Sequence, residues 1–257
     1  MKTKLGLIGH KISYSISPLI HEAIGRFVGA DIDYELIDIT SDLIPTYIEL
    51  LKQGKYQGFN VTKPYKEEMI AYVDELSPIA QSLKAINTIY MQDGKVIGDN
   101  TDVFGYKYLL DYFKINVKDK KVLILGTGGA SKAVAYVLKQ RDANVTFASR
   151  TPGLKKDTIS YHDIKPKAFD IYINATPIGT YPNIDHCVLS KDEVVDQIVI
   201  DLIYKPKETQ LMKFSKEAYN GFVMLLAQAV KSEMLWLEQH VAIHETIDEL
   251  MDVIKYE

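Results

Sequence analysis

The sequence contains a single cysteine, only three arginines and no long run of apolar residues. The lone cysteine, Cys187, excludes an intramolecular disulfide and a cysteine-rich metal site, and its polar surroundings predict a half-buried thiol rather than a nucleophile. A membrane-spanning helix needs roughly 20 apolar residues, and the apolar run near the N-terminus is too short for a secretory signal. We therefore expect a cytoplasmic protein that has no membrane partner.

A strong excess of charge of either sign is also lacking. The 257-residue chain has a net charge of −4 and no block of like charges, so nothing indicates a nucleic-acid partner. His240 and His244 are four residues apart in a segment predicted to be helical, but no third ligand accompanies them, so we predict no metal site. Monomer and homodimer both stay open as the oligomeric state.

The pattern that is present alternates short apolar runs with amphipathic segments of helical length, which predicts an α/β fold with parallel sheets and crossover helices. We expect strands at residues 5–9, 34–39, 58–61, 121–125, 144–148, 170–174 and 198–202, and a hairpin of residues 85–91 and 95–98. We expect helices at residues 17–28, 42–51, 101–113 and 129–139, and two more from about residue 222. Domain boundaries are expected near residues 102 and 221.

The most informative segment is a buried strand, Lys121–Leu125, followed by the run Gly126-Thr127-Gly128-Gly129-Ala130. The first glycine allows a tight turn, and the second lets the backbone approach a pyrophosphate closely. The third begins a helix whose N-terminal N–H groups and dipole attract the anion. This G-x-G-G-A variant, placed between a strand and a helix, predicts a dinucleotide-binding turn.

The end of the following strand distinguishes between the two nicotinamide cofactors. An NAD enzyme usually has an acidic residue there, which binds the ribose 2′-hydroxyl. This chain instead has Ser149, Arg150 and Thr151, which suit a 2′-phosphate and predict NADP as the cofactor. The simpler alternative is an ordinary exposed charge after a strand.

Polar clusters in the first 102 residues indicate a second ligand. They are Ser15-Ile16-Ser17-Pro18 and residues 60–66, 85–88 and 98–102. Taken singly, they have structural explanations: Ser17 and Asp102 can cap helices, Asn87 can belong to a turn, and Lys66 can be a solvated charge. Together they offer hydroxyls, amides, an amine and a carboxylate, which are the groups that a small polyhydroxylated acid needs.

Motifs along nearly the whole chain resemble, in order and spacing, those of the shikimate dehydrogenase family. They are S-x-S-P, N-V-T-x-P-x-K, A-x-N-T, D-N-T-D, G-x-G-G-A-S, S-R-T, I-N-A-T and G-x-x-M-L-x-x-Q-A. Three positions depart from the family pattern. Lys63 stands where an apolar residue is usual, Val103 replaces a frequent glycine, and Leu154 replaces an arginine that often contacts the 2′-phosphate. Lys155 or Lys156 can substitute for that arginine as a point charge, so we expect a weaker preference for NADP than is usual.

The resemblance implies an NADP-dependent oxidoreductase that reversibly reduces 3-dehydroshikimate to shikimate in aromatic amino acid biosynthesis. It implies a substrate-binding and catalytic domain at residues 1–102 and 222–257, and a Rossmann-type NADP-binding domain at residues 103–221. Lys66 and Asp102 match the catalytic pair of the family. The positions that match its substrate-binding residues are Ser15, Ser17, Thr62, Asn87, Tyr204 and Gln228. Leu202 and Gly221 match positions on the nicotinamide side of the cofactor.

Other functions stay open. One is a quinate/shikimate dehydrogenase that uses NAD as well as NADP. Another is a non-catalytic, cofactor-sensing protein on the same fold, although the presence of both Lys66 and Asp102 disfavours it. A folate-linked methylene dehydrogenase shares the architecture, but the S-x-S-P and D-N-T-D motifs do not favour it.

Replacing Arg150 by alanine tests the assignment of the cofactor. Because the guanidinium is expected to bind the 2′-phosphate, which NADH lacks, we expect the KM for NADPH to rise far more than the KM for NADH. Steady-state kinetics with both cofactors measures this difference. An equal change in the two KM values would show that the assignment is wrong.

Overall fold

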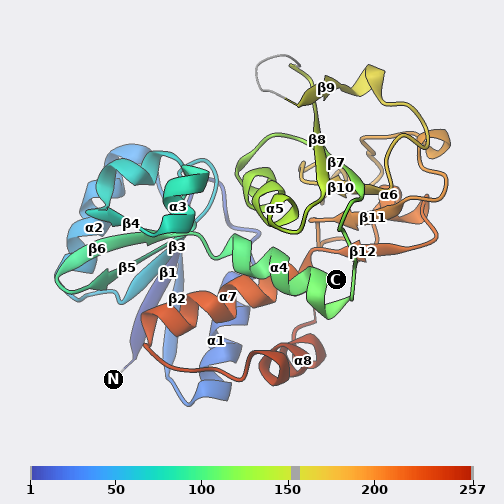
Figure 1. The fold of residues 1–257 in the computed structure, drawn as a ribbon. Helices are drawn as coiled ribbons and strands as arrows, with labels where there is room; N and C mark the ends of the chain where they lie inside the picture. Colours follow the sequence, from blue (N-terminus) through green and yellow to red (C-terminus); the bar gives the residue numbers. More distant parts are fainter. Residues whose placement is uncertain (1, 152–156, 256–257) are drawn as a thin grey trace. The chain divides into compact units, whose positions relative to one another are not determined.

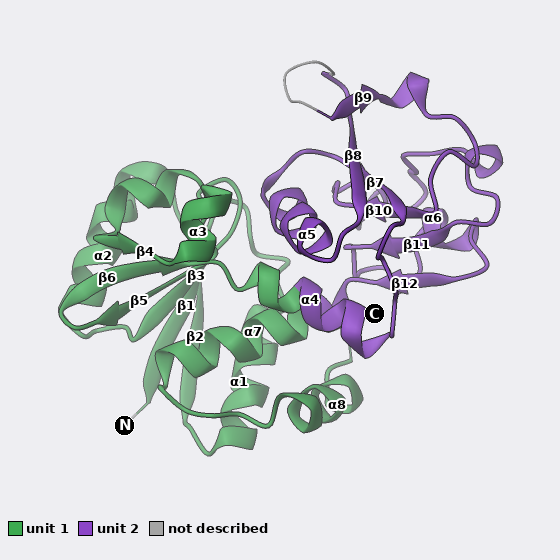
Figure 2. Ribbon diagram, in the orientation of Figure 1, with its two compact units in different colours: residues 1–105, 225–255 green, residues 106–224, 256–257 purple. Residues whose placement is uncertain are grey.

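The computed structural model describes residues 2–151 and 157–255. The chain divides into two compact units, one formed by residues 1–105 and 225–255 and the other by residues 106–224 (Figure 2). Each unit is built around its own six-stranded sheet. The C-terminal helices therefore belong to the same unit as the N-terminal strands.

The sheet of the first unit is mixed and has the strand order β2-β1-β3-β5-β6-β4. Its strands are β1 (Thr3–Gly9), β2 (Ile32–Asp38), β3 (Gly58–Val61), β4 (Glu75–Leu76), β5 (Thr88–Gln92) and β6 (Lys95–Asp99). Strand β1 is parallel to β2 and β3, whereas β5 is antiparallel to β3 and β6. The β5–β6 turn has Asp93 and Gly94 at positive φ (49° and 76°), the backbone conformation that a tight hairpin turn requires.

Helices cover both faces of this sheet (Figure 1). They are α1 (Ser17–Val28), α2 (Ile44–Lys52), α3 (Pro78–Leu83), α7 (Phe222–Trp236) and α8 (Ile243–Val253), with 3₁₀ turns η1 (Ser41–Leu43) and η2 (Glu68–Tyr72). Successive side chains of a strand point to opposite faces. Accordingly, Leu5 and Leu7 of β1 pack in a cluster with Trp236 of α7, whereas Ile8 packs in a second cluster with Ile44 of α2. The unit thus has three layers, with the sheet in the middle.

The second unit has an all-parallel sheet in the order β12-β11-β10-β7-β8-β9. Its strands are β7 (Lys121–Leu125), β8 (Asn144–Ser149), β9 (Thr158–Ser160), β10 (Ile171–Asn174), β11 (Ile198–Asp201) and β12 (Ala218–Asn220). Its helices are α5 (Gly129–Gln140) and α6 (Gln210–Lys213), with 3₁₀ turns η3 (Tyr161–Asp163) and η4 (Lys191–Glu193). Numbered along the chain within the unit, this is the 3-2-1-4-5-6 order of a Rossmann fold. Helix α4 (Asp102–Tyr112) begins in the first unit and ends in the second.

The structure confirms the α/β fold class, and it confirms the strands predicted at residues 58–61 and 121–125 to the residue. Most other predicted elements are present with ends that differ by a few residues. The elements η2, β4, α3, α6, β9 and β12 were not predicted. Several of them are only two or three residues long, which is too short for a hydrophobic period to develop.

Some local predictions are wrong. Residues 85–87 are not part of the hairpin strand, because β5 begins only at Thr88. Ser17 does not cap α1: Ile16 is the N-cap, and Ser17 is the first helical residue. His240 and His244 do not share a helix, since α7 ends at Trp236 and α8 begins at Ile243.

Within the described residues, no helix is long and apolar enough to cross a membrane. In that same part of the chain, no group of three or more histidine, cysteine, aspartate or glutamate side chains could hold a metal ion. Leu154, Lys155 and Lys156, which bear on the strength of the NADP preference, lie outside the described residues.

Candidate functional site

The topology of the first sheet brings three polar segments to one edge. Strand β3 ends at Val61, and the antiparallel strand β5 begins beside it, because Asn60 pairs with Thr88. Strand β6 ends beside the start of β5, since Thr88 also pairs with Asp99. The residues after β3, before β5 and after β6 therefore meet at this edge. They include Lys66, Asn87 and Asp102.

Lys66 and Asp102 form the central contact of the site. The Nζ atom of Lys66 donates a hydrogen bond of 2.6 Å to Oδ2 of Asp102. The two side chains are only 19% and 10% exposed, so the pair is largely shielded but still open to a ligand. Asp102 is the first residue of α4, and its carboxylate binds Lys66. An ammonium group held in this way can donate a proton to a bound ligand.

Asn87 fixes the carboxylate from the other side. Its Nδ2 atom donates to Oδ1 of Asp102 at 2.9 Å and to Oγ1 of Thr101 at 3.0 Å. Its Oδ1 atom accepts a hydrogen bond of 2.6 Å from the backbone N–H of Thr101. Both ends of the buried Asn87 amide are therefore hydrogen-bonded. Because Oδ1 of Asp102 is bonded to Asn87 and Oδ2 to Lys66, both carboxylate oxygens have a partner, which fixes the rotamer of Asp102.

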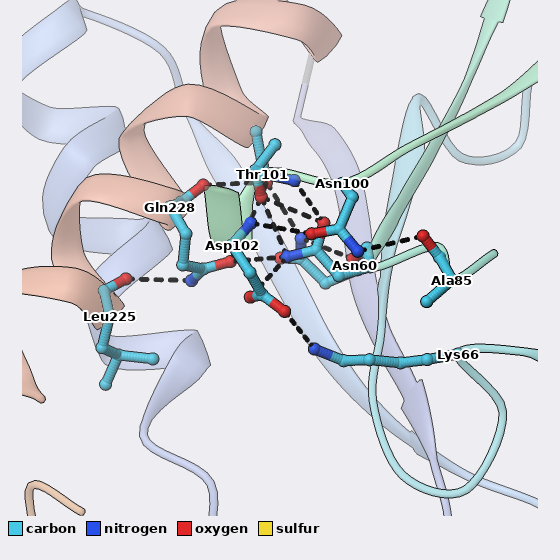
Figure 3. A network of polar contacts seen from close by, with 10 residues as sticks. Asn60, Lys66, Ala85, Asn100, Thr101, Asp102, Leu225 and Gln228 are labelled. Carbon is cyan, nitrogen blue, oxygen red and sulfur yellow. Dashed lines mark hydrogen bonds and ion pairs between the residues drawn. The ribbon is translucent and has the colours of Figure 1, made fainter. Parts of the chain in front are cut away.

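Helix α7 closes the network with Gln228 (Figure 3). The Oε1 atom of Gln228 lies 3.4 Å from Nδ2 of Asn87, and its Nε2 atom donates to the carbonyl oxygen of Leu225 at 2.9 Å. The structure therefore joins Lys66, Asn87, Asp102 and Gln228, four of the predicted site residues, through direct hydrogen bonds.

Asn60, Thr101 and Ser232 are buried members of the network that were not among the predicted site residues. Asn60 donates from Nδ2 to Oγ of Ser232 at 3.0 Å and to the carbonyl oxygen of Asn87 at 3.3 Å. The Ser232 and Thr101 hydroxyl oxygens are 3.1 Å apart. Asn60 and Thr101 stand within quoted motifs, and Ser232 lies one helical turn after Gln228. The spacing of four residues between Gln228 and Ser232 could have indicated Ser232 from the sequence, since residues four apart share a helix face.

The predicted serines lie in the loop between β1 and α1. The Oγ atom of Ser15 donates to Oγ of Ser17 at 3.0 Å and accepts from the Ser17 N–H at 3.2 Å. The start of this loop is held by Asp38, whose carboxylate accepts from the backbone N–H groups of Lys11 and Ile12. The bond from Lys11 is the main reason why the pKa of Asp38 lies below its usual value. The structure thus pairs the serines with each other, not with Lys66.

Thr62 and Lys63 follow β3. Thr62 packs closely on β1. A Cβ atom added to Gly9 of that strand would lie only 2.6 Å from Cγ2 of Thr62. Partial removal from water, and secondly the positive charge of Lys66, lower the pKa of Lys63. Lys63 therefore adds positive potential near Lys66, which an anionic ligand at this edge would experience.

The glycine-rich turn of the second unit lies at the point where the strand order reverses. Gly126 follows β7 with φ at +100°, and a Cβ there would approach Cγ2 of Thr176, after β10, to 2.9 Å. Gly128 is the N-cap of α5, and a Cβ added to it would meet nothing within 4 Å. Within the described residues, no side chain caps α5. A helix N-terminus without a side-chain cap and with space beside Gly128 fits a pyrophosphate.

The end of β8 carries Ser149, Arg150 and Thr151. The backbone N–H of Thr151 donates to Oγ of Ser149 at 3.2 Å, which folds the chain back at the strand end. The exposed Arg150 lies near enough to Tyr161 for its charge to oppose the burial that raises the pKa of that phenol. An exposed guanidinium at this position is available to a ligand.

Leu202, Tyr204 and Gly221, which were predicted to contact the cofactor or the substrate, follow β11 and β12. A Cβ on Gly221 would lie 2.2 Å from the carbonyl oxygen of Leu202, so only glycine fits this approach. The rings of Tyr204 and Phe222 are 6.4 Å apart. All three residues belong to the second unit.

A buried carboxylate supports these loops. Oδ1 of Asp201, at the end of β11, accepts hydrogen bonds from Nδ2 of Asn174 and the N–H of Ile203, both at 3.0 Å. Its Oδ2 atom accepts from Oγ1 of Thr209 at 2.7 Å. Asn174 in turn accepts from the N–H and hydroxyl of Thr176. Burial nevertheless dominates and raises the pKa of Asp201 to about 6.

Comparison with known proteins decides the family. A family model described as the shikimate dehydrogenase substrate binding domain matches residues 7–89. The shikimate dehydrogenase (NADP(+)) of Methanocaldococcus jannaschii is 39% identical over 259 residues, which cover 91% of this chain and 92% of the relative. The corresponding protein of Clostridium beijerinckii is 36% identical over 246 residues and 91% of each chain. The chain belongs to the shikimate dehydrogenase family.

The fold of a solved structure agrees with this membership of the shikimate dehydrogenase family. A chorismate mutase/shikimate 5-dehydrogenase fusion protein from Clostridium acetobutylicum superposes with a TM-score of 0.93 at 32% identity. The match covers 98% of this chain and 97% of that one. Both units of the present chain are therefore those of a shikimate dehydrogenase.

The pH dependence of stability tests the environment of Asp201. Its pKa is raised in the folded state, so the charged form is disfavoured there relative to the unfolded chain. This penalty is absent below the usual value of about 4 and complete above the folded pKa. The amide of an Asp201→Asn variant carries no charge at any pH. We therefore expect the variant to gain stability relative to the wild type, on the order of 2–3 kcal/mol, as pH rises from about 4 to about 7.

Thermal unfolding of the two proteins across this pH range measures the effect. Asp185→Asn, which removes one carboxylate at an exposed position, is the matched control. A difference in Tm between Asp201→Asn and wild type that stays constant, or that moves against the variant with rising pH, would contradict the assignment.

Proposed function

We propose that this protein is a shikimate dehydrogenase whose Lys66 and Asp102 catalyse the reversible NADPH-dependent reduction of 3-dehydroshikimate to shikimate. The observation that supports these roles most directly is the 2.6 Å contact between the two side chains, held by Asn87, in a chain of this family. The reaction is a step of aromatic amino acid biosynthesis.

NADP, when bound, supplies the hydride chemistry of the reaction. The open N-terminus of α5 and the turn Gly126–Ala130 would hold its pyrophosphate. Ser149, Arg150 and Thr151 would hold the 2′-phosphate, and Leu202 and Gly221 would lie on the nicotinamide side. The domain at residues 103–221 is accordingly assigned to the cofactor.

Lys66 acts at the carbonyl oxygen of 3-dehydroshikimate. Reduction of a ketone places negative charge on that oxygen, and a neighbouring ammonium group both stabilises the charge and donates the proton. Asp102 orients the ammonium group through Oδ2, and Asn87 orients Asp102 through Oδ1. In the direction of shikimate oxidation, neutral Lys66 takes the hydroxyl proton back.

The remaining polar residues are assigned to substrate binding. All of them except Tyr204 lie in residues 1–102 and 222–257, which we assign to the substrate-binding and catalytic domain. Ser15 and Ser17 would bind the substrate carboxylate, since hydroxyl groups can donate to both of its oxygens. Thr62, Asn87, Gln228 and Tyr204 would bind its other polar groups. Lys63 would add attraction for the anion.

The alternatives are less well supported. The relatives from Clostridium beijerinckii and Methanocaldococcus jannaschii carry the name shikimate dehydrogenase (NADP(+)), which favours shikimate and NADP over relaxed use of quinate and NAD. A non-catalytic sensor would not need the Lys66–Asp102 contact. A cytoplasmic location and a monomeric or homodimeric state stay predictions from the sequence.

A kinetic panel tests the proposed function. We expect kcat/KM to be highest for shikimate with NADP⁺, and clearly lower when quinate replaces shikimate or NAD⁺ replaces NADP⁺. Absorbance of the reduced cofactor measures all four combinations. No oxidation of shikimate with either cofactor would refute the proposal, and equal rates with quinate and NAD⁺ would support the relaxed enzyme instead.

Removal of Lys66 tests its role in chemistry. In Lys66→Ala we expect kcat to fall on the order of 10²–10⁴-fold, because the proton donor is lost, while the KM for shikimate changes little. Lys63→Ala is the matched control, since it removes a nearby ammonium group that is assigned to attraction of the substrate and not to proton transfer. A large rise in KM at unchanged kcat in Lys66→Ala would reassign Lys66 to substrate binding.

A further inference from the structure

A buried pair of ionisable side chains, His21 and Glu233, joins helices α1 and α7 of the first unit. His21 lies on α1 and Glu233 on α7, and both side chains are 0% exposed. The Nδ1 atom of His21 and the Oε1 atom of Glu233 are 2.6 Å apart. None of the roles assigned above uses either residue.

The His21–Glu233 pair joins the two helices at an unfavourable free energy of burial. Nε2 of His21 and Oε2 of Glu233 are fully buried, and neither has a hydrogen-bond partner among the described residues. Buried polar atoms without partners disfavour folding, and replacing such a pair by apolar side chains is often neutral or stabilising. Stability therefore does not explain why these residues are here.

Each residue is close in sequence to an assigned substrate-binding residue. His21 lies one helical turn after Ser17, at the start of α1. Glu233 follows Ser232 directly on α7, and Gln228 lies on the same helix little more than one turn earlier. A fixed contact between His21 and Glu233 therefore limits how Ser17 and Gln228 can move relative to each other.

Aromatic and polar contacts connect the pair with the network around Asp102. The ring of His21 stacks on that of Tyr34, with centroids 4.1 Å apart and planes 7° apart. The hydroxyl of Tyr34 donates to Oδ1 of Asn60 at 2.7 Å, and Asn60 donates to Ser232. Burial, and secondly the charge of Glu233, raise the pKa of Tyr34, so its hydroxyl stays protonated and keeps this donor role.

We propose that His21 and Glu233 are positioning residues that hold α1 and α7 in the relative position required for binding shikimate. This inference rests on the proposed function, because Ser17 and Gln228 are the substrate contacts that the pair aligns. The His21–Glu233 pair acts through the helices and does not touch the substrate or the cofactor. It affects the affinity for shikimate, and it leaves the affinity for NADP unchanged.

Two variants separate positioning from folding. His21→Phe combined with Glu233→Leu keeps a ring against Tyr34 but removes the hydrogen bond and both unpartnered atoms. Glu233→Gln keeps an oxygen that can accept from Nδ1 of His21 and is the conservative control. For wild type and both variants, the KM for shikimate, the KM for NADP⁺, kcat and Tm are measured.

We expect the double variant to fold with a Tm at or above that of the wild type and to show a KM for shikimate about tenfold higher, with the KM for NADP⁺ within about twofold. Glu233→Gln should stay within about threefold of the wild-type KM for shikimate. A double variant that does not fold, or that binds shikimate as the wild type does, would overturn the inference. A wild type that does not oxidise shikimate would instead refute the proposed function.

Discussion

The hydrogen bond between Lys66 and Asp102 is the interaction around which the polar network of the first unit is arranged. An ammonium group near the sheet edge would sample many rotamers if no carboxylate held it. Asp102 can hold it only because Asn87 binds its second oxygen, and Asn87 is fixed in turn by Thr101 and Gln228. The mixed sheet supplies the segments that meet, and α7 completes them from the C-terminal part of the chain.

The second unit depends on a different constraint, the parallel strand order that leaves a reversal between β7 and β10. At that point Gly126 and Thr176 approach closely, and the N-terminus of α5 is free of side-chain caps within the described residues. Asp201 supports the neighbouring loops at the cost of burying a carboxylate. A strained backbone and a buried carboxylate both disfavour folding, and such features occur mainly where the backbone is positioned to bind a ligand.

The sequence was most predictive where the physics is local. The apolar period and the glycine turn located β7 and α5. The motifs pointed to Lys66, Asn87, Asp102 and Gln228, whose side chains the structure joins by hydrogen bonds. It was least predictive for contacts between distant segments: Asn60 and Ser232 are 172 positions apart, and His21 and Glu233 are 212 apart. No periodicity encodes such pairs, because they exist only once α7 has returned to the first sheet.

The energetic coupling between Lys66 and Asp102 in catalysis most directly tests the claim that the two side chains act as one unit. Lys66→Met, Asp102→Asn and the double variant would be compared by kcat/KM for shikimate with NADP⁺. If the two residues act as one unit, each single variant loses most of the activity and the double variant loses little more. Losses that multiply in the double variant would show that the two side chains act independently and would contradict the account.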